Sequence, residues 1–378
     1  MTGKRSLHGK MQFPHLRKMR RFFPEAAARV LAALLLLNLL TGCSESTGNT
    51  DRETGNGELV SETSEFFLMD TWMTLTVYGY GTAPEEALKA AKEELTRLEE
   101  LFSTGKSTSE ISLINENGEG TLSEDTAAIV EMSLELYERT DGAFDITIYP
   151  LMKLWGFTDK NYHVPDEAEL QPVLAVCGSG LLDYDPDTRY LRLSEGQGID
   201  LGAIAKGYAS NRLIDLFEEY GIVSGVISLG GNVQLYGSKP DGSDWNCGIV
   251  DPFRPDDASS YAGILSESDK AIITSGTYER NFTDSETGIT YHHIMDPATG
   301  MPAESGIVSA TVVSADGMLA DGLTTALFVL GEEKAIEYWK MYGEDFDMVL
   351  VTEDARVLVT EGIADRFTSD YPVTVISR

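Results

Sequence analysis

An oxygen pair stands out among the residues that could do chemistry. Asp321 and Thr325 lie four residues apart in the apolar segment ADGMLADGLTTALFVLG, residues 315–331, which is predicted to form a helix. At that spacing the two side chains stack on one helix face. Carboxylate, hydroxyl and backbone carbonyl oxygens are hard ligands, which favour magnesium or calcium over zinc. The pattern indicates a metal site, although a threonine that bonds back into its own helix is the simpler alternative.

A second candidate site opens a helix in the middle of the chain. Asp200 closes a short apolar segment, and Gly202 lets the backbone turn into a helix that we expect to begin near Ala203. The first N–H groups of such a helix have no helical partner and suit a phosphate. Lys206 lies in the first turn, where a cation is unfavourable to the helix itself, so a nearby anion would explain its position. A solvated lysine is the alternative.

Three more polar residues are candidates because of their surroundings. If residues 291–295 are extended, only one of two adjacent histidines can face a site, and His293 is favoured because it precedes the turn DPATG. A hydrogen-bonded structural histidine is the alternative. Asp145 interrupts the apolar run GAFDITIYPLMKLWGF, where a charge is costly unless it is paired or used. The turn at Ser275 could donate to phosphate oxygens, although such turns are often structural.

Hydrophobic periodicity predicts the elements that position these residues. Residues 66–78 alternate as a strand with one buried face, and Met69 lies near its start, either facing a ligand or filling the core. Residues 83–102 form an amphipathic helix. Ser109 and Ser123 are expected to cap the next two helices. Short mixed strands follow without a βαβ repeat, a GxGxxG motif or a Walker lysine loop, so the predicted fold class is α+β.

The N-terminus, residues 1–42, is typical of a lipoprotein signal peptide. A leader with eight Lys and Arg residues precedes the apolar run 30–40, which is shorter than the roughly 20 residues of a membrane-spanning helix. Leu40-Thr41-Gly42-Cys43 resembles the lipobox of bacterial lipoproteins, in which Cys43 would carry the lipid. An uncleaved anchor and an ordinary signal peptide are the alternatives. We expect a flexible tether over residues 43–64, a domain over 65–378, and a lipid-anchored protein on the extracytoplasmic face of the cell membrane.

The charge of the chain limits its partners. The formal net charge is −32, and removal of residues 1–42 takes it to −39, because 21 basic and 60 acidic residues remain. Nucleic acid is therefore an improbable partner. Anionic lipid headgroups would also repel this body, so lipid and tether must hold it at a membrane. Cys177 and Cys247 are expected to be two buried thiols, with pairing left open.

Many short motifs, in the same order, resemble the ApbE family. They are MDT at 69–71, FST and SEISLIN within 102–115, DGAFDITIYPLMKLWGF, IDLGAIAKGYA, SLGGN, ITSGTYERNF, HHIMDPATG and ADGLTTALFVLG. The resemblance covers about residues 65–375. That family consists of FAD:protein FMN transferases, often lipoproteins. It implies a two-lobed fold of mixed short-stranded sheets with flanking helices, and a flavin cleft between the lobes.

The resemblance also implies roles for individual residues. Magnesium would be bound by Asp321, Thr325 and the carbonyl of Ala203, while Lys206 and His293 would serve catalysis. The residues implied to hold FAD are Met69, Ala143, Phe144, Asp145, Asp200, Lys206 and the neighbourhood of Met295, to which we add the turn at Ser275.

The expected reaction is transfer of FMN from FAD to a Ser or Thr hydroxyl of an acceptor flavoprotein, with release of AMP. The alternatives are a magnesium-dependent FAD pyrophosphatase, in which water replaces the acceptor, and a lipoprotein that binds FAD without turnover. Three positions depart from the family pattern. Gly105 stands where many members have an aromatic residue, Asn211 where an aspartate is usual, and Asp70 where a glycine is common.

Overall fold

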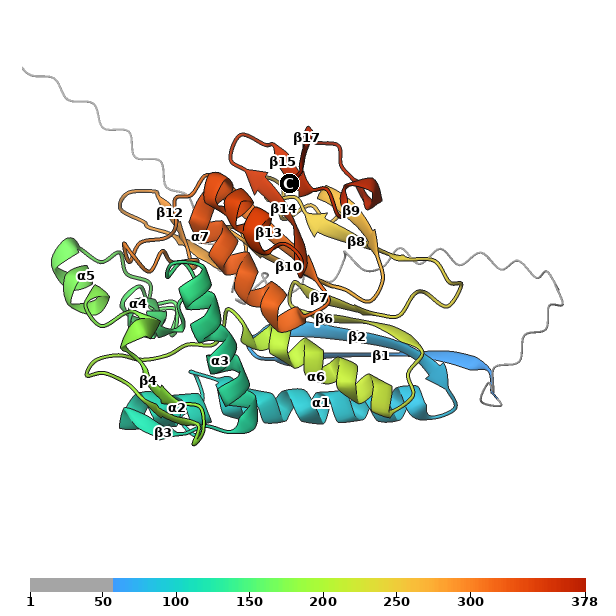
Figure 1. Ribbon diagram of the computed structural model, residues 1–378, viewed down its shortest axis with the longest axis horizontal. Coiled ribbons are helices and arrows are strands. Elements are labelled where there is room, and N and C mark those ends of the chain that lie inside the picture. Colours follow the sequence, from blue (N-terminus) through green and yellow to red (C-terminus); the bar gives the residue numbers. More distant parts are fainter. Residues whose placement is uncertain (1–56) are drawn as a thin grey trace, which may run out of the picture.

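A nine-stranded sheet forms the centre of the protein (Figure 1). The structure is a computed structural model and describes residues 57–378. Neighbouring strands are antiparallel, apart from the last two, which are parallel. Across the sheet they are β1 (Leu59–Leu68), β2 (Thr71–Tyr80), β6 (Ser224–Leu229), β7 (Asn232–Tyr236), β10 (Ala271–Gly276), β13 (Ile307–Ser314), β14 (Phe346–Thr352), β15 (Val357–Thr360) and β17 (Val373–Ile376).

Three small sheets and seven α-helices complete the described part of the chain. The small sheets are β16 (Phe367–Thr368), β9 (Tyr261–Glu267) and β8 (Trp245–Val250); β3 (Glu119–Thr121), β5 (Tyr190–Arg192) and β4 (Asp183–Asp185); and β11 (Asn281–Thr283) with β12 (Thr290–His292). The helices are α1 (Ala83–Phe102), α2 (Glu110–Asn117), α3 (Glu124–Arg139), α4 (Tyr149–Leu154), α5 (Glu167–Leu174), α6 (Ala205–Glu219) and α7 (Gly317–Tyr342). The predicted α+β class is confirmed.

The core fills both faces of the large sheet. Apolar residues of α1, α3, α6 and α7 pack on one face, where α6 and α7 lie side by side in Figure 1. The small sheet β16-β9-β8 covers part of the other face. A third cluster joins α4 to the segment before β13 through Met152, Trp155, Phe157 and Met295. None of the helices within residues 57–378 combines the length and apolar character that crossing a bilayer requires.

The predicted helices form with the apolar face and the serine caps that the sequence indicated. The helix predicted over 83–102 is α1, and its apolar face is buried. Ser109 accepts a hydrogen bond from the Ser112 N–H, and Ser123 accepts one from the Thr126 N–H, so both serines cap helices as predicted. The helix expected near Ala203 begins at Ala205 instead, because residues 201–204 form a turn.

The single strand predicted over 66–78 is wrong, because two strands and a tight turn occupy this region. Met69 and Asp70 turn the chain between β1 and β2 with φ of 48° and 59°, a left-handed conformation that is uncommon for residues other than glycine. Met69 therefore lies at the hairpin tip, two residues before β2 begins. Asp is among the residues that tolerate this conformation.

The N-terminal boundary of the domain is earlier than expected. β1 begins at Leu59 and pairs with β2 along its whole length, so residues 59–64 belong to the sheet and not to a tether. The predicted signal peptide, Cys43 and most of the predicted tether lie outside the described residues. Cys177 and Cys247 are unpaired and half-buried, and desolvation raises the pKa of each thiol to about 12.

Two glycines allow α6 and α7 to pack backbone to backbone. A Cβ on Gly207 would lie 2.1 Å from the carbonyl oxygen of Gly317, so no larger residue fits at this crossing. The approach brings the first turn of α6 against the first turns of α7. This crossing places the two candidate sites of the sequence beside each other.

Candidate active site

Six charged or titratable residues form what we call the polar cluster. They are Asp200, Lys206, Glu279, Arg280, His293 and Asp321. They come from the turn before α6, the first turn of α6, the segments that flank β11 and β12, and α7. The charges of Lys206 and Arg280 act on Asp200, Glu279 and His293, which places all of these side chains within electrostatic reach of one another.

Asp321 joins α7 to the first turn of α6. Its Oδ2 accepts a hydrogen bond of 2.8 Å from the backbone N–H of Gly207. In a regular helix that N–H would donate to the carbonyl of Ala203, four residues earlier. No backbone N–H of residues 57–378 donates to the Ala203 carbonyl in its place. The contact therefore leaves a carbonyl oxygen available at the start of α6.

Two more oxygens near this contact, Asp321 Oδ1 and the Thr325 hydroxyl, also have no protein donor in the part of the chain that the structure describes. Asp321 is only 4% exposed, yet no donor among the described residues reaches its Oδ1. Thr324 bonds back to the Asp321 carbonyl at 2.7 Å and contacts the Ser275 hydroxyl at 2.9 Å. The hydroxyl of Thr325 has no hydrogen-bond partner within residues 57–378. The back-bonding that was the alternative for Thr325 is thus made by its neighbour.

These three free oxygens fit a hard divalent cation. The Asp321 residue is largely buried and its Oδ1 has no donor from residues 57–378, so a cation at Oδ1 would offset part of the cost of burying this charge. Carboxylate, hydroxyl and carbonyl oxygens suit Mg²⁺, which is usually held by one or two carboxylates together with substrate phosphates. Within the described residues, no three His, Cys, Asp or Glu side chains converge on one point. A metal here would therefore depend on main-chain and hydroxyl oxygens.

Asp200 and Lys206 border the start of α6. Asp200 Oδ1 accepts a hydrogen bond of 2.7 Å from the Gly202 N–H, and desolvation raises the pKa of this carboxyl despite the opposing charges of Arg280 and Lys206. Lys206 Nζ lies 3.4 Å from the Gly202 carbonyl oxygen. Its ammonium group makes no ion pair with a carboxylate of the described residues. Lys206 thus remains available to an anionic ligand.

Glu279 is a member of the polar cluster that the sequence analysis missed. Its carboxylate lies over the β6–β7 turn, where a Cβ on Gly231 would be 3.6 Å from Oε1. Desolvation raises the pKa of Glu279 to about 7, with Asp321 adding to the rise and Lys206 opposing it. The paired glycines were expected to mark a close approach, and at Gly230 the approaching group is Thr71 of the same chain.

His293 is fixed by the backbone of Arg280. The Arg280 carbonyl oxygen lies 3.0 Å from the His293 backbone nitrogen and 3.2 Å from Nδ1. Because a carbonyl can only accept, Nδ1 carries the proton and Nε2 keeps its lone pair. Burial, with the nearby charge of Arg280, lowers the pKa of His293 to about 3. The imidazole is therefore neutral at pH 7 and can accept a proton at Nε2.

The comparisons with known proteins agree on one family. The family model described as the ApbE family matches residues 69–350. The chain belongs to the ApbE family. A FAD:protein FMN transferase of Klebsiella pneumoniae (strain 342) is 32% identical over 306 residues, which are 80% of this chain and 92% of that protein. One from Treponema pallidum (strain Nichols) is 31% identical over 76% of this chain and 84% of its own length.

Solved structures of ApbE proteins share the fold. The ApbE protein from Thermotoga maritima superposes with a TM-score of 0.74 at 30% identity, over 80% of this chain and 98% of that one. The flavin transferase ApbE from Vibrio cholerae superposes with a TM-score of 0.70 at 26% identity, over 83% of this chain and 98% of that one.

Several residues that the ApbE resemblance placed at FAD have buried side chains. The ring of Phe144 is 1% exposed and belongs to the helix-covered core, and Met295 is 2% exposed in the third cluster. Both side chains pack in the core, and contact of these segments with FAD stays a prediction. Ala143 is also buried, so this segment could contact a ligand only through its backbone. Ser275 lies close by, but its hydroxyl is paired with Thr324.

Asp145 is satisfied by the protein itself. Its carboxylate accepts hydrogen bonds from the Thr147 N–H and hydroxyl at 2.8 and 2.7 Å, and from the Ser179 hydroxyl at 2.6 Å. The expected pairing of a charge in an apolar run is therefore present. These contacts assign the Asp145 side chain to holding the segment before α4 against residues 178–179, and a direct role toward FAD stays a prediction.

Met69 is connected to the loop after α1 through the Glu99 carboxylate. The Met69 N–H donates to Glu99 Oε1 at 2.7 Å, and Lys106 Nζ lies 2.6 Å from Glu99 Oε2. One carboxylate therefore holds both the β1–β2 turn and the loop that contains Gly105. Gly105 offers no ring to a ligand at this position.

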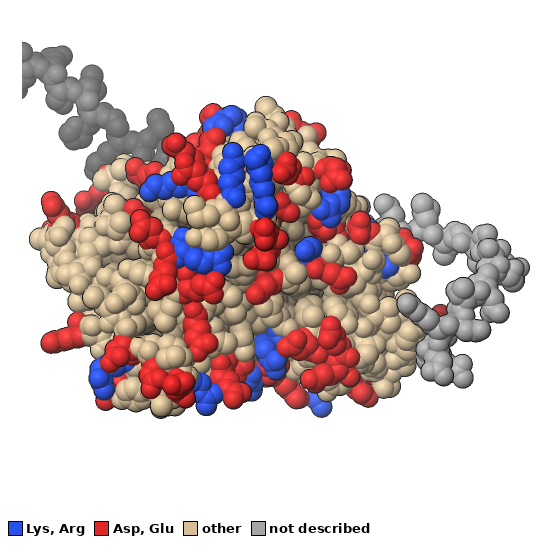
Figure 2. Space-filling view, in the orientation of Figure 1, with Lys and Arg blue, Asp and Glu red and all other residues tan. Residues whose placement is uncertain are grey.

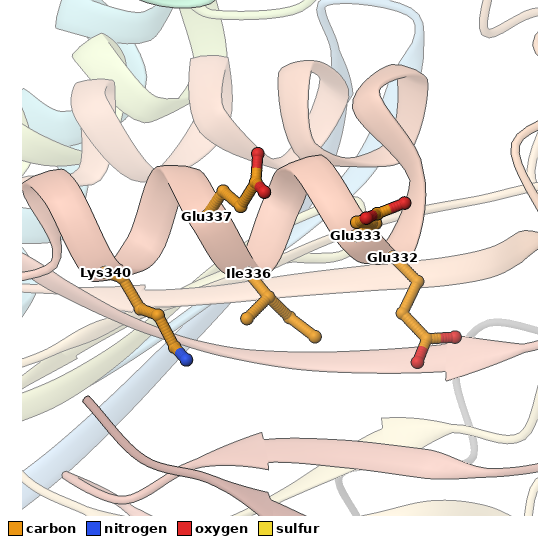
Figure 3. A pocket seen from close by; sticks show the side chains of 5 residues that line it. All are labelled: Glu332, Glu333, Ile336, Glu337 and Lys340. Atoms are coloured by element: carbon orange, nitrogen blue, oxygen red, sulfur yellow. The ribbon is translucent and has the colours of Figure 1, made fainter.

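Two surface hollows lie apart from the polar cluster. The larger, of 410 Å³, runs along the C-terminal half of α7 and is lined by Glu332, Glu333, Ile336, Glu337 and Lys340 (Figure 3). The smaller, of 300 Å³, lies beside α3. No residue of the polar cluster lines either one. The flavin cleft between two lobes therefore stays a prediction.

Proposed function

We propose that this protein transfers FMN from FAD to a Ser or Thr hydroxyl of an acceptor flavoprotein and uses Mg²⁺ to do so. The relatives named above are FAD:protein FMN transferases. The observation that carries the proposal is the Asp321–Gly207 contact, because it brings the Asp321 carboxylate to the amino end of α6 and leaves the Ala203 carbonyl without a backbone donor among the described residues. A diphosphate with its cation needs this combination of oxygen ligands, N–H donors and a positive charge.

The transfer is a displacement at phosphorus. The acceptor hydroxyl oxygen bonds to the phosphorus of the FMN half of FAD, and the bond from that phosphorus to the bridging oxygen breaks. The electron pair leaves with AMP. Since the attacking group comes from the acceptor, the enzyme needs no nucleophile of its own. Its contribution is positioning and charge neutralisation.

His293 has the proton-accepting role in this scheme. Nδ1 is committed to the Arg280 carbonyl, so Nε2 is the atom that accepts the hydroxyl proton. A pKa of about 3 keeps this nitrogen unprotonated in the free protein. An anionic diphosphate would oppose the charges of Arg280 and Lys206 and raise the pKa toward neutrality, which would make the imidazole a stronger base.

The metal would be held by Asp321, Thr325 and the Ala203 carbonyl. When bound, Mg²⁺ neutralises charge on phosphate oxygens and orients them. Lys206 binds and orients the same diphosphate from the first turn of α6. Asp200 would keep the turn before α6 in shape through its bond to the Gly202 N–H.

We also propose that the protein is a lipoprotein held at the extracytoplasmic face of the membrane through Cys43. The proposal is supported by the basic leader, the short apolar run and the lipobox-like sequence before Cys43. Figure 2 shows many acidic side chains on the visible face of the domain, with fewer basic ones among them and uncharged areas between. Such a surface would contribute little to binding anionic lipid, so the lipid would carry the attachment.

A reconstituted reaction tests the function. The full chain is mixed with FAD, Mg²⁺ and a candidate acceptor, and the acceptor mass and the released AMP are measured. We expect the acceptor to gain one FMN for each AMP released. If free FMN appears and the acceptor stays unmodified, the reaction is hydrolysis and not transfer. If FAD stays intact, the protein catalyses neither reaction.

A histidine variant tests the proton acceptor in the same assay. His293→Asn keeps an N–H donor near the position of Nδ1 but removes Nε2. We expect transfer to fall by about 10²–10⁴-fold, the range for general acid–base groups, with FAD affinity little changed. An unchanged rate would remove His293 from the proposed role.

A further inference from the structure

Arg280 lies in the polar cluster, and the scheme above gives its side chain no contact with FAD, only a charge that lowers the pKa of His293. Its carbonyl accepts hydrogen bonds from both the backbone N–H and Nδ1 of His293. Changes to the Arg280 side chain leave that carbonyl in place. The role of the guanidinium can therefore be separated from the positioning of the histidine.

The guanidinium is loosely held. Nη2 lies 3.3 Å from the Phe157 carbonyl oxygen and 3.7 Å from Asp70 Oδ2, both longer than the 2.7–2.9 Å of a strong charge-assisted hydrogen bond. The side chain is 49% exposed. A guanidinium has five N–H donors, and these two contacts leave most of them available. The group is held in direction without being saturated by the protein.

The polar cluster has more acidic than basic side chains, so an anionic ligand needs the charge of Arg280. The polar cluster contains three carboxylates, Asp200, Glu279 and Asp321, against two permanent cations, Lys206 and Arg280. The chain as a whole has a net charge of −32. A dianionic diphosphate that enters such surroundings is repelled unless cations face it directly. Arg280 acts electrostatically on Asp200, Glu279 and His293, so it lies centrally among these groups.

We propose that the Arg280 guanidinium binds the nonbridging oxygens of the FMN phosphoryl group during transfer, and that Asp70 at the tip of the β1–β2 turn orients it. The proposal rests on the proposed function. As the acceptor oxygen bonds to phosphorus and the bridging oxygen leaves with AMP, the guanidinium neutralises charge on the nonbridging oxygens. Arg280 is thereby a catalytic residue, and Asp70 is a positioning residue.

The planar fork of arginine is part of this role. Two parallel N–H groups match two phosphoryl oxygens, and the ammonium group of lysine cannot reproduce that geometry. Arg280→Lys should therefore restore charge without the fork, and its activity should fall between those of the wild type and Arg280→Ala.

Chemical rescue of the full chain separates a catalytic guanidinium from a structural one. AMP release and acceptor mass are followed for the wild type and Arg280→Ala, with and without added guanidinium chloride at concentrations that do not unfold the protein. We expect Arg280→Ala to lose about 10²–10³-fold in kcat/KM, and added guanidinium to restore about tenfold of it. Ammonium chloride at equal ionic strength should restore little, because it lacks the fork.

Two results would overturn the proposal. Arg280→Ala could keep a kcat/KM close to that of the wild type, or its loss could remain when guanidinium is added. The wild type measured in parallel tests the proposed function separately, because an inactive wild type counts against FMN transfer itself. Asp70→Asn is the matched variant, since Asn also tolerates positive φ and removes only the partner charge. We expect it to lower kcat/KM by about two- to fivefold, as for the loss of other exposed ion pairs, and an unchanged kcat/KM would remove Asp70 from the positioning role.

Discussion

The Oδ2 atom of Asp321 accepts a hydrogen bond of 2.8 Å from the backbone N–H of Gly207, across 114 residues of sequence. The bond satisfies a donor in the first turn of α6 and leaves the Ala203 carbonyl free. One carboxylate therefore serves the packing of two helices and also belongs to the set of oxygens that fits a metal.

Two substitutions at Asp321 should separate these roles. Asp321→Asn keeps an oxygen that can accept from Gly207, so stability should change little, while loss of the charge should raise the Mg²⁺ concentration needed for activity. Asp321→Ala leaves the Gly207 N–H without a partner and should lower the free energy of unfolding by about 1–3 kcal/mol. Urea unfolding with EDTA present and Mg²⁺ titration of AMP release measure the two effects. Equal Mg²⁺ dependence in Asp321→Asn and the wild type would contradict the metal assignment.

Adjacent threonines provide a matched pair. The Thr325 hydroxyl has no hydrogen-bond partner in the described chain, whereas Thr324 bonds to the Asp321 carbonyl and the Ser275 hydroxyl. Thr325→Val should weaken the response to Mg²⁺ with little change in stability. Thr324→Val should lower the free energy of unfolding by about 1 kcal/mol. Reversed results for the two variants would show that Thr324 supplies the ligand.

Glu279 predicts a pH-dependent stability. Desolvation by the groups around its carboxylate raises the pKa of Glu279 from 4.5 to about 7. The contribution of Glu279 to the free energy of unfolding is therefore most favourable below pH 4.5 and is lost as the pH rises through about 7. Glu279→Gln removes this loss. In EDTA, the melting temperature of the variant relative to the wild type should therefore be higher at about pH 8 than at about pH 5. A difference that is constant with pH would mean that Glu279 is not desolvated.

The helix crossing predicts a strong glycine requirement. Gly207→Ala places a Cβ 2.1 Å from the Gly317 carbonyl oxygen, so α6 must move away from α7. We expect a loss of about 1–3 kcal/mol or more in the free energy of unfolding. We also expect AMP release to respond less to added Mg²⁺. Gly105→Ala is the control, because its Cβ would approach only Ser103 Oγ, at 3.7 Å. Comparable losses in both variants would point away from the crossing as the cause.

The sequence was sufficient where a pattern is local. The periodicity of residues 83–102 predicted α1, the serine caps predicted helix starts, and the spacing of Asp321 and Thr325 predicted a shared helix face. That face carries the free oxygens described above. Ala203 was identified only through the family resemblance. No residue pattern would have identified it, because its carbonyl is free only when the Gly207 N–H donates to Asp321 instead.

Other features depend on the tertiary structure. The β1–β2 turn at Met69 and Asp70 contains no glycine, proline or Asn-Gly pair, and apolar alternation continues through it, so the hairpin had no local signal. Glu279 and Arg280 are ordinary charged residues in sequence, and only their assembly with Lys206 and Asp321 distinguishes them. Phe144 and Met295 have rings or chains that suit a ligand or a core equally, and packing decides between them.

The direction of β1 determines from which side a partner can come. The strand runs for ten residues, about 33 Å, from Leu59 to the hairpin tip, where Asp70 meets Arg280. Any attachment through the residues before 57 would therefore act at the opposite end of this strand. Such a tether would attach the domain at the end opposite Asp70 and Arg280. The end that carries the polar cluster would then be free to meet large substrates in solution or at a neighbouring membrane complex.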